Sequence, residues 1–399
     1  MYRKLHVTDL DLSGRRVLTR VDFNVPLTRD GGVADDTRIK RALPTIKHII
    51  ESGGRVILAS HMGRPKGQAV PSLSMKPAAA RLAELLGREV VVAPDCVGDT
   101  TEGMAAQLSD GEILLLENLR FHMGETKNET DFARRLGRMG DVYVNDAFGT
   151  AHRAHASTVG VTEFFDRRAM GLLIETELEN LAKATDDPKK PYVAILGGAK
   201  VSDKIGVIDN LLPKVDELLV GGGMAFTFLA AQGRGVGNSL LEADRVETAA
   251  ALLAKAEQMG KPLVLPSDIV VADAVEEGAA SKVVDVDGIE PGWQGVDIGP
   301  QTVDEFGRKI ARAQTIAWNG PLGVFEIPAF AAGTLGVAQA VAARTDTGAT
   351  SIIGGGDSAS AVVAAGLEGR VTHISTGGGA SLMFLEGKPL PAIEALSDA

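Results

Sequence analysis

Short apolar runs alternate with longer helical stretches from one end of the chain to the other. The runs read RVLTRVDF, RVILAS, EILLLENL, DVYVND, YVAILGG, ELLVGGG, PLVLPSDIV, QTIAWNG, SIIGGG and THISTGGG. Strand-like runs separated by helical segments indicate parallel sheets that are covered by helices on both faces. The chain is therefore predicted to be an α/β protein, and its length of 399 residues predicts two domains.

The residues at the ends of these runs divide the chain into two halves. Open α/β sheets bind ligands beyond the carboxyl ends of their strands. Up to about residue 155 those ends carry charged side chains, whereas after about residue 190 they carry glycine. Between the halves, leucines recur at roughly helical spacing from Leu172 to Leu181 until Pro188, which predicts a helix that joins two domains.

The run RVDFNVPL, residues 20–27, alternates polar and apolar side chains. In a strand, this alternation would place Arg20, Asp22 and Asn24 on one face and the apolar residues on the other, and Pro26 would end the strand. An amphipathic strand with a solvated face would show the same pattern. A cation, an anion and an amide on one face also suit the recognition of a polar substrate.

Basic side chains gather near the strand ends of the first half. They are Arg20, Arg38, His61, Arg64, Arg120, His152 and Arg153. The forked guanidinium group of arginine binds carboxylate and phosphate oxygens in pairs. A single surface arginine is usually solvated, but repeated placement in a chain of net charge −11 predicts a site for a small, multiply anionic substrate.

Glycine-rich turns follow the strands of the second half. Glycine lets backbone N–H groups approach phosphate oxygens, and a following helix adds the positive end of its dipole. Lys200 and Lys204 in GGAKVSDK would share one face if a helix began there. Asp357 in GGGDS stands where a helix should begin, a suitable place for a magnesium-binding carboxylate beside a phosphate.

These turns match neither G-x-x-x-x-G-K-[ST] nor, convincingly, G-x-G-x-x-G, yet together they favour a nucleotide site. An anion site and a nucleotide site on separate domains predict phosphoryl transfer, which depends on positioning and charge neutralisation. Holding two polyanions on separate domains would also limit their repulsion until the domains close.

The charge and the cysteine content limit the remaining classes. A net charge of −11 argues against unspecific binding to nucleic acids or anionic membranes. The single cysteine, Cys96, excludes an internal disulfide framework, fits a reducing compartment and is expected to be a packed thiol. The first residues lack the apolar core of a secretory signal, and Pro328, Gly333 and Gly336 interrupt the longest uncharged run, so a cytoplasmic protein is expected.

Eight segments in the same order closely resemble the phosphoglycerate kinase family. They are RVDFNVPL, SHMGRPKG, LLENLRFH, VNDAFGTAHRAHAS, GGAKVSDK, WNGPLGVFE, GGGDS and STGGGASLMFLEGK. The resemblance runs from about residue 5 to the C-terminus. It implies two Rossmann-like domains whose parallel sheets face a central cleft, and a monomer that closes about its hinge. It also implies a transferase of glycolysis and gluconeogenesis that moves a phosphoryl group reversibly, with Mg²⁺, between 1,3-bisphosphoglycerate and ADP.

The resemblance also implies domain limits and the role of each site residue. The expected parts are a phosphoglycerate-binding domain (1–170), a hinge helix and linker (171–187), a nucleotide-binding domain (188–387) and a tail (388–399) that packs on the first domain. The residues that resemble the family's substrate site are Asp22, Asn24 and Arg38 for the hydroxyl and carboxyl end, and His61, Arg64, Arg120 and Arg153 for the 3-phosphate. Those that resemble its nucleotide site are Lys204, Gly295, Asn319, Glu326 on the ribose, Gly355, Gly356, Asp357 near magnesium, and Ser358.

Three residues are expected to act on the migrating phosphoryl group, namely Arg38, Lys200 and Gly378 of the Gly377–Gly379 turn, with Asn319 also close to it. The chain departs from the family pattern at Met383 and Phe384, where Glu and Leu are common. Ser358 stands where many members carry threonine.

Three other interpretations remain open at this point. A two-domain binding protein that closes on its ligand would need neither the lysine pair nor the magnesium carboxylate. A nicotinamide dehydrogenase would need the glycine fingerprint followed by an acidic residue at the end of a strand. A catalytically silent relative would carry the same residues, so an assay of ATP-dependent phosphorylation of 3-phosphoglycerate has to distinguish it.

Overall fold

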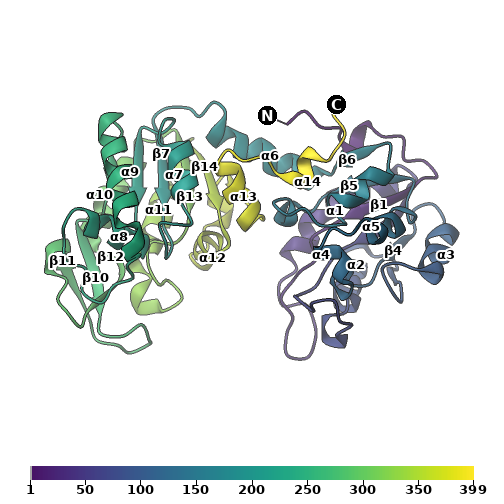
Figure 1. Cartoon of the computed structure of the whole chain (residues 1–399), viewed down its shortest axis with the longest axis horizontal. Coiled ribbons are helices and arrows are strands. Elements are labelled where there is room, and N and C mark those ends of the chain that lie inside the picture. Colours follow the sequence, from purple (N-terminus) through teal and green to yellow (C-terminus); the bar gives the residue numbers. More distant parts are fainter. Residues whose placement is uncertain (1) are drawn as a thin grey trace. The chain divides into compact units, whose positions relative to one another are not determined.

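A computed structural model describes residues 2–399 as two compact units (Figure 1). The first unit runs to Glu179 and includes Pro389–Ala399, and the second is Asn180–Lys388. Helix α6 (Leu172–Thr185) contains the point where the units divide. Within residues 2–399, no helix combines the length and the apolar character needed to cross a membrane.

The first unit contains a six-stranded sheet in the order β3-β4-β2-β1-β5-β6, and all its strand pairs are parallel. Its strands are β1 (Arg16–Arg20), β2 (Arg55–Ala59), β3 (Val91–Val92), β4 (Ile113–Leu115), β5 (Val142–Asn145) and β6 (Arg168–Met170). Its helices are α1 (Thr37–Glu51), α2 (Lys76–Leu86), α3 (Asp99–Gln107), α4 (Met123–Thr126), α5 (Thr130–Gly137) and α14 (Pro391–Glu394). The tail belongs to this unit, because the Lys4 ammonium donates to the carbonyl oxygen of Leu396 at 3.1 Å and to Asp398 at 2.8 Å.

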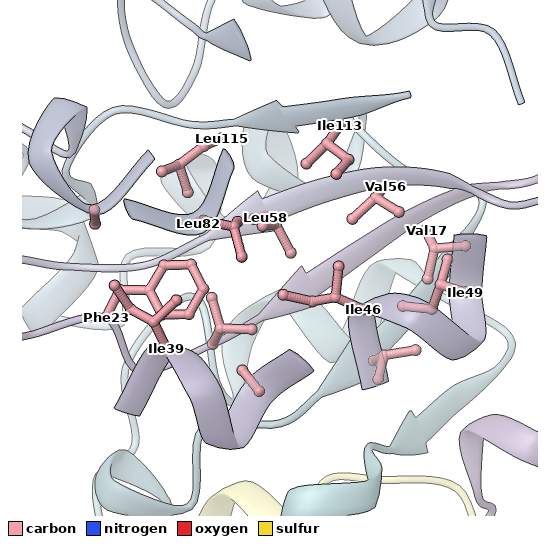
Figure 2. Packing of buried hydrophobic residues seen from close by; sticks show 14 of the residues in the cluster. Val17, Phe23, Ile39, Ile46, Ile49, Val56, Leu58, Leu82, Ile113 and Leu115 are labelled. Atoms are coloured by element: carbon pink, nitrogen blue, oxygen red, sulfur yellow. The ribbon is translucent and has the colours of Figure 1, made fainter. Parts of the chain in front are cut away.

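The core of the first unit forms between the sheet and its helices. Val17 on β1 and Val56 and Leu58 on β2 are buried against the apolar face of α1, which Ile46 and Ile49 provide (Figure 2). Apolar residues recur on α1 at helical spacing, so one face packs on the sheet while its charged residues remain at the surface. This packing fixes the carboxyl ends of β1 and β2, where the basic residues lie.

The second unit contains a parallel sheet in the order β15-β14-β13-β7-β8-β9. Its strands are β7 (Tyr192–Leu196), β8 (Glu217–Val220), β9 (Leu263–Val264), β13 (Thr315–Asn319), β14 (Thr350–Gly354) and β15 (His373–Ile374). Its helices are α7 (Ile205–Leu211), α8 (Met224–Ala231), α9 (Val246–Gln258), α10 (Pro300–Ile310), α11 (Ala332–Asp346), α12 (Gly356–Ala364) and α13 (Gly378–Leu385). Two six-stranded parallel sheets with surrounding helices confirm the predicted α/β class.

A second, three-stranded sheet in this unit was not predicted. It is antiparallel, in the order β11-β10-β12, with β10 (Asp268–Ala272), β11 (Ser281–Asp285) and β12 (Gln294–Ile298) (Figure 1). The run PLVLPSDIV, expected as one strand, contributes β9 to the parallel sheet and β10 to this one. The break contains Pro266, which cannot donate a ladder hydrogen bond.

Candidate active site

The segment after β1 keeps the predicted alternation of burial but is not a strand. Strand β1 ends at Arg20, so the expectation that the strand continues to Pro26 is wrong. The backbone N–H of Phe23 donates to Ser60 Oγ at 2.8 Å, so a side chain from the loop after β2 replaces the ladder partner. Val21, Phe23 and Val25 are buried, and the side chain of Asp22 remains 10 % exposed at the strand ends.

Arg20 is fully buried and fixes the ring of His61. Its Nη2 lies 3.1 Å from His61 Nδ1, and its Nε donates to Ser157 Oγ at 2.8 Å. Ser157 Oγ in turn donates to the buried carboxylate of Glu125 at 2.6 Å. Because guanidinium nitrogens only donate, Nδ1 of His61 is the acceptor and the neutral ring keeps its proton on Nε2.

Burial and nearby cations hold His61 in this neutral form. Desolvation, followed by the charges of Arg20 and Arg120, lowers the pKa of His61 well below its ordinary value. The ring therefore presents an Nε2–H donor at neutral pH. A neutral donor suits a phosphate oxygen without adding a further buried charge to the cluster.

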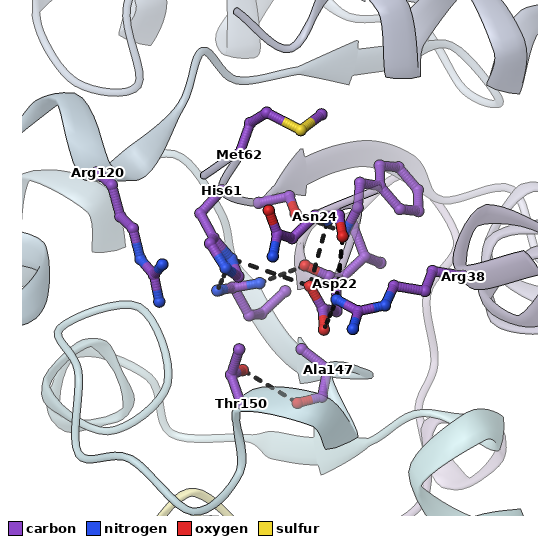
Figure 3. A network of polar contacts seen from close by, with 12 residues as sticks. Asp22, Asn24, Arg38, His61, Met62, Arg120, Ala147 and Thr150 are labelled. Carbon is purple, nitrogen blue, oxygen red and sulfur yellow. Dashed lines mark hydrogen bonds and ion pairs between the residues drawn. The ribbon is translucent and has the colours of Figure 1, made fainter. Parts of the chain in front are cut away.

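Arg38 lies on the first turn of α1 and points toward Asp22 (Figure 3). Its Nη1 donates to Asp22 Oδ2 at 3.0 Å and to the carbonyl oxygen of Asn24 at 3.1 Å. Asn24 Oδ1 accepts the backbone N–H of Gly63 at 2.8 Å, which ties this group to the loop after β2. Asp35 Oδ1 accepts the first backbone N–H of α1 at 2.9 Å and so helps to orient the helix that carries Arg38.

Arg120 is a buried cation with an unused donor. Its Nη1 donates to the carbonyl oxygen of Gly63 at 2.9 Å, while its Nε has no partner among residues 2–399. Desolvation, together with the charges of Arg20 and Arg153, lowers the pKa of Arg120 to about 10. A buried guanidinium that is surrounded by other cations and not fully hydrogen-bonded favours an incoming anion.

The other predicted substrate residues make few contacts within the protein. Arg153 Nε approaches His152 Nε2 at 3.0 Å. Arg64 is exposed and forms no hydrogen bond or ion pair in the part of the chain that the structure describes. Both guanidinium groups therefore retain donors for a ligand.

A cavity of about 550 Å³ in the second unit brings together most of the predicted nucleotide residues. Its lining includes Lys200, Lys204, Asn319, Gly355, Gly356, Asp357 and Ser358. Helix α7 begins only at Ile205, so the expectation that the two lysines share a helix face is wrong, although both line the cavity. Helix α12 begins at this cavity, so its first N–H groups and positive dipole end face it.

Lys204 and Asn319 form one paired part of the wall of this cavity. Lys204 Nζ donates to Asn319 Oδ1, and desolvation lowers the pKa of the lysine. Ser358 Oγ is fully buried, accepts the N–H of Gly320 at 2.6 Å and donates to the carbonyl oxygen of Gly354 at 2.9 Å. The hydroxyl of Ser358 is therefore used within the fold.

An adjoining apolar pocket of about 200 Å³ contains Gly295 and Glu326 in its lining. Asp357 lines both cavities. A Cβ atom on Gly295 would lie 2.0 Å from Phe226 Cζ, so any side chain there would collide with the pocket wall. The walls also include Leu240 and Leu322, which the motif analysis did not single out. Leu322 lies within the quoted segment WNGPLGVFE but was given no role there, and Leu240 lies outside every quoted run and motif.

Gly378 lies beside this site without lining either cavity. A Cβ atom at Gly378 would be 3.8 Å from the backbone nitrogen of Gly356, so α13 begins next to the start of α12. The structure thus brings the predicted residues together as two groups, one in each unit. No feature of the sequence indicated that Arg20 positions His61. Its hydrogen bonds to His61 and Ser157 join segments that lie far apart in sequence.

Comparisons with known proteins agree on one family. A family model described as phosphoglycerate kinase matches residues 7–388. Phosphoglycerate kinase of Chloroherpeton thalassium is 56 % identical over 397 residues, covering 100 % of both chains. The cytosolic phosphoglycerate kinase of Triticum aestivum is 54 % identical, covering 98 % of this chain and 97 % of the relative. The solved phosphoglycerate kinase of Coxiella burnetii has a TM-score of 0.87 at 42 % identity, covering 98 % of each chain.

Proposed function

The chain belongs to the phosphoglycerate kinase family, and on that premise we propose how its residues carry out the reaction. The chain is a phosphoglycerate kinase, a phosphotransferase of glycolysis whose acceptor is a carboxyl group. It exchanges a phosphoryl group between 1,3-bisphosphoglycerate and ADP, giving 3-phosphoglycerate and ATP. Two features support the proposed residue roles. One unit contains a buried Arg120 that is not fully hydrogen-bonded, and the other contains a cavity lined by glycine and lysine residues.

The first unit binds the phosphoglycerate. Arg120, Arg64 and Arg153 hold the 3-phosphate with the Nε2–H of His61, because these groups combine positive charge with free donors. Asp22 and Asn24 face the hydroxyl and carboxyl end. The guanidinium of Arg38, fixed through Nη1 alone, keeps its other nitrogens for the carboxylate and the transferred group.

The second unit binds the nucleotide. The base occupies the apolar pocket around Gly295, Glu326 faces the ribose, and the phosphates lie in the larger cavity. There Lys204 and the first N–H groups of α12 neutralise phosphate charge, and the start of α13 lies beside them. Lys200, the Asn319 amide and the N–H of Gly378 act on the phosphoryl group in transit.

Magnesium fits this site through Asp357. This exposed carboxylate lies on the first turn of α12 and lines both cavities, so it can reach a cation that is held mainly by nucleotide phosphates. The bound ion would neutralise charge on the phosphate oxygens. The residues of this chain hold the nucleotide, exclude water and orient the reacting oxygens.

Transfer is direct and in line, and it requires the two units to close on their ligands. In the direction of ATP use, a carboxylate oxygen of 3-phosphoglycerate bonds to the γ-phosphorus as the bond to the β-bridging oxygen breaks, and ADP leaves with that electron pair. The division of the contact units inside α6 supports this helix as part of the hinge. The protein is proposed to act as a cytoplasmic monomer, by analogy with its cytosolic wheat relative as to location.

A coupled assay tests the function directly. The purified protein, given Mg-ATP and 3-phosphoglycerate, should form ADP and 1,3-bisphosphoglycerate, which a dehydrogenase reduces with loss of NADH absorbance. No signal above that of a heat-denatured sample, with both ligands bound as judged by calorimetry, would identify a silent relative. ATP hydrolysis without 3-phosphoglycerate would argue for a different acceptor.

Replacing Asp357 by asparagine should weaken Mg-nucleotide binding about tenfold or more, because a charged contact contributes about 1.5–3 kcal/mol. Affinity for 3-phosphoglycerate should remain unchanged, since its proposed site lies in the other unit. Titration calorimetry with each ligand measures both values. Asp304→Asn on α10 is the matched control, and equal losses for both ligands in Asp357→Asn would contradict the magnesium assignment.

A further inference from the structure

A cluster of three different donor groups in the first unit has no part in the mechanism above. Asp95, Cys96 and His122 bring a carboxylate oxygen, a sulfur and a ring nitrogen within 4.8 Å of one another. Asp95 Oδ1 lies 2.7 Å from His122 Nε2. Cys96 is the only cysteine of the chain.

Neighbouring contacts hold the three groups in place. The backbone N–H of Cys96 donates to Asp95 Oδ1 at 2.6 Å, and Thr101 Oγ1 donates to the carbonyl oxygen of Asp95 at 3.0 Å. The ring of His122 packs against that of Phe132, with centroids 5.4 Å apart. These contacts hold both the segment of Asp95 and Cys96 and the ring of His122.

The cluster can be reached from solvent on one side. Asp95 and His122 line a cavity of about 470 Å³, and their side chains are 45 % and 31 % exposed, whereas Cys96 is fully buried. Glu117 lines the same cavity, but its oxygens accept from the N–H groups of Met75 and Asn118 and from a serine hydroxyl. Asp95 and His122 would meet an entering cation at the cavity wall, and the buried sulfur of Cys96, which does not line the cavity, lies within 4.8 Å of their ligand atoms. Water would supply the fourth position.

We propose that Asp95, Cys96 and His122 form a binding site for a thiophilic divalent cation, for which zinc is the best match. One thiolate, one imidazole and one carboxylate with an open position form a ligand set that zinc accepts, whereas magnesium and calcium select oxygen ligands. The site is distinct from the proposed magnesium position at Asp357. It does not depend on the proposed roles of the catalytic residues.

Binding at this site releases protons. Zinc binds cysteine as the thiolate and histidine through an unprotonated ring nitrogen, so the S–H proton of Cys96 leaves to solvent when the S–metal bond forms.

Cobalt(II) provides the test, because it reports sulfur ligation by a charge-transfer band in the near ultraviolet. The nucleotide-free, full-length protein should develop this band with one equivalent of cobalt, and zinc should displace it. Since the chain has a single cysteine, the band can arise only from Cys96. Cys96→Ser should abolish it, and His122→Gln should weaken zinc binding at least about tenfold.

Two matched variants and a stability measurement complete the test. Asp99→Asn and His48→Gln should bind zinc like the parent, and the same zinc concentration should raise the thermal midpoint of the parent more than that of His122→Gln. His122 is partly exposed, so this comparison holds even if Cys96→Ser fails to fold. Absence of the band, or equal zinc affinity in the parent and His122→Gln, would reduce the cluster to an ion pair beside a packed thiol.

Discussion

Arg38→Ala should lower kcat at least about a thousandfold, because arginines that neutralise a migrating phosphoryl group contribute roughly 10³–10⁵ in rate. Arg38 forms its contacts to Asp22 and Asn24 through Nη1, so the outer edge of its fork is available for the carboxylate and phosphoryl oxygens. This interaction strengthens as the transition state forms, and its loss therefore appears in kcat. Nucleotide affinity should stay unchanged.

A lysine at position 38 distinguishes the contribution of the positive charge from that of the forked guanidinium geometry. Arg38→Lys should recover only part of the activity, because an ammonium group cannot bridge two oxygens in one plane. Lys47→Ala, on the same helix and exposed, is the matched control for effects on α1. Steady-state kinetics with both substrates, supported by circular dichroism, measure the outcome. If Arg38→Ala keeps more than about a tenth of the parent kcat, the side chain serves only to pair with Asp22.

The parallel sheets could be predicted from the sequence because their strands are buried on both faces and so read as continuous apolar runs. Strand β7, Tyr192–Leu196, and strand β13, Thr315–Asn319, are buried at every position. Strand β11 carries exposed residues at four of its five positions, so no hydrophobic pattern marked it. Strands β3 and β6, of two and three residues, are too short to give a periodic signal.

Tertiary contacts explain the errors of detail in the site. Alternation in RVDFNVPL correctly indicated that Val21, Phe23 and Val25 turn to the core, but it predicted the wrong element, since Ser60 from another loop takes the place of a ladder partner. The residues at strand ends could be named because parallel strands bring them to one edge. Two properties of the site could not be predicted from the sequence, namely the neutral state of His61 and the incomplete hydrogen bonding of Arg120. Both depend on burial beside Arg20, which sequence spacing does not encode.

Arg120→Met should raise the KM for 3-phosphoglycerate about a hundredfold, since a charged, desolvated hydrogen-bonded contact contributes about 1.5–3 kcal/mol. Methionine keeps the length and volume of the buried stem and removes the charge. In the ligand-free protein this charge is repelled by Arg20 and Arg153. The thermal midpoint of the ligand-free variant should therefore equal or exceed that of the parent. If Arg120 only supported the fold, its replacement would lower this midpoint.

The ligand dependence of stability gives the clearest measurement. Saturating 3-phosphoglycerate should raise the thermal midpoint of the parent, because it binds only the folded state and relieves the repulsion among the buried cations. The same concentration should raise the midpoint of Arg120→Met far less, while Mg-ATP should stabilise both proteins equally. Arg135→Ala, an exposed arginine on α5, should behave like the parent. A steep loss of stability with an unchanged KM would show that Arg120 holds the loop at Gly63 and does not bind the phosphate.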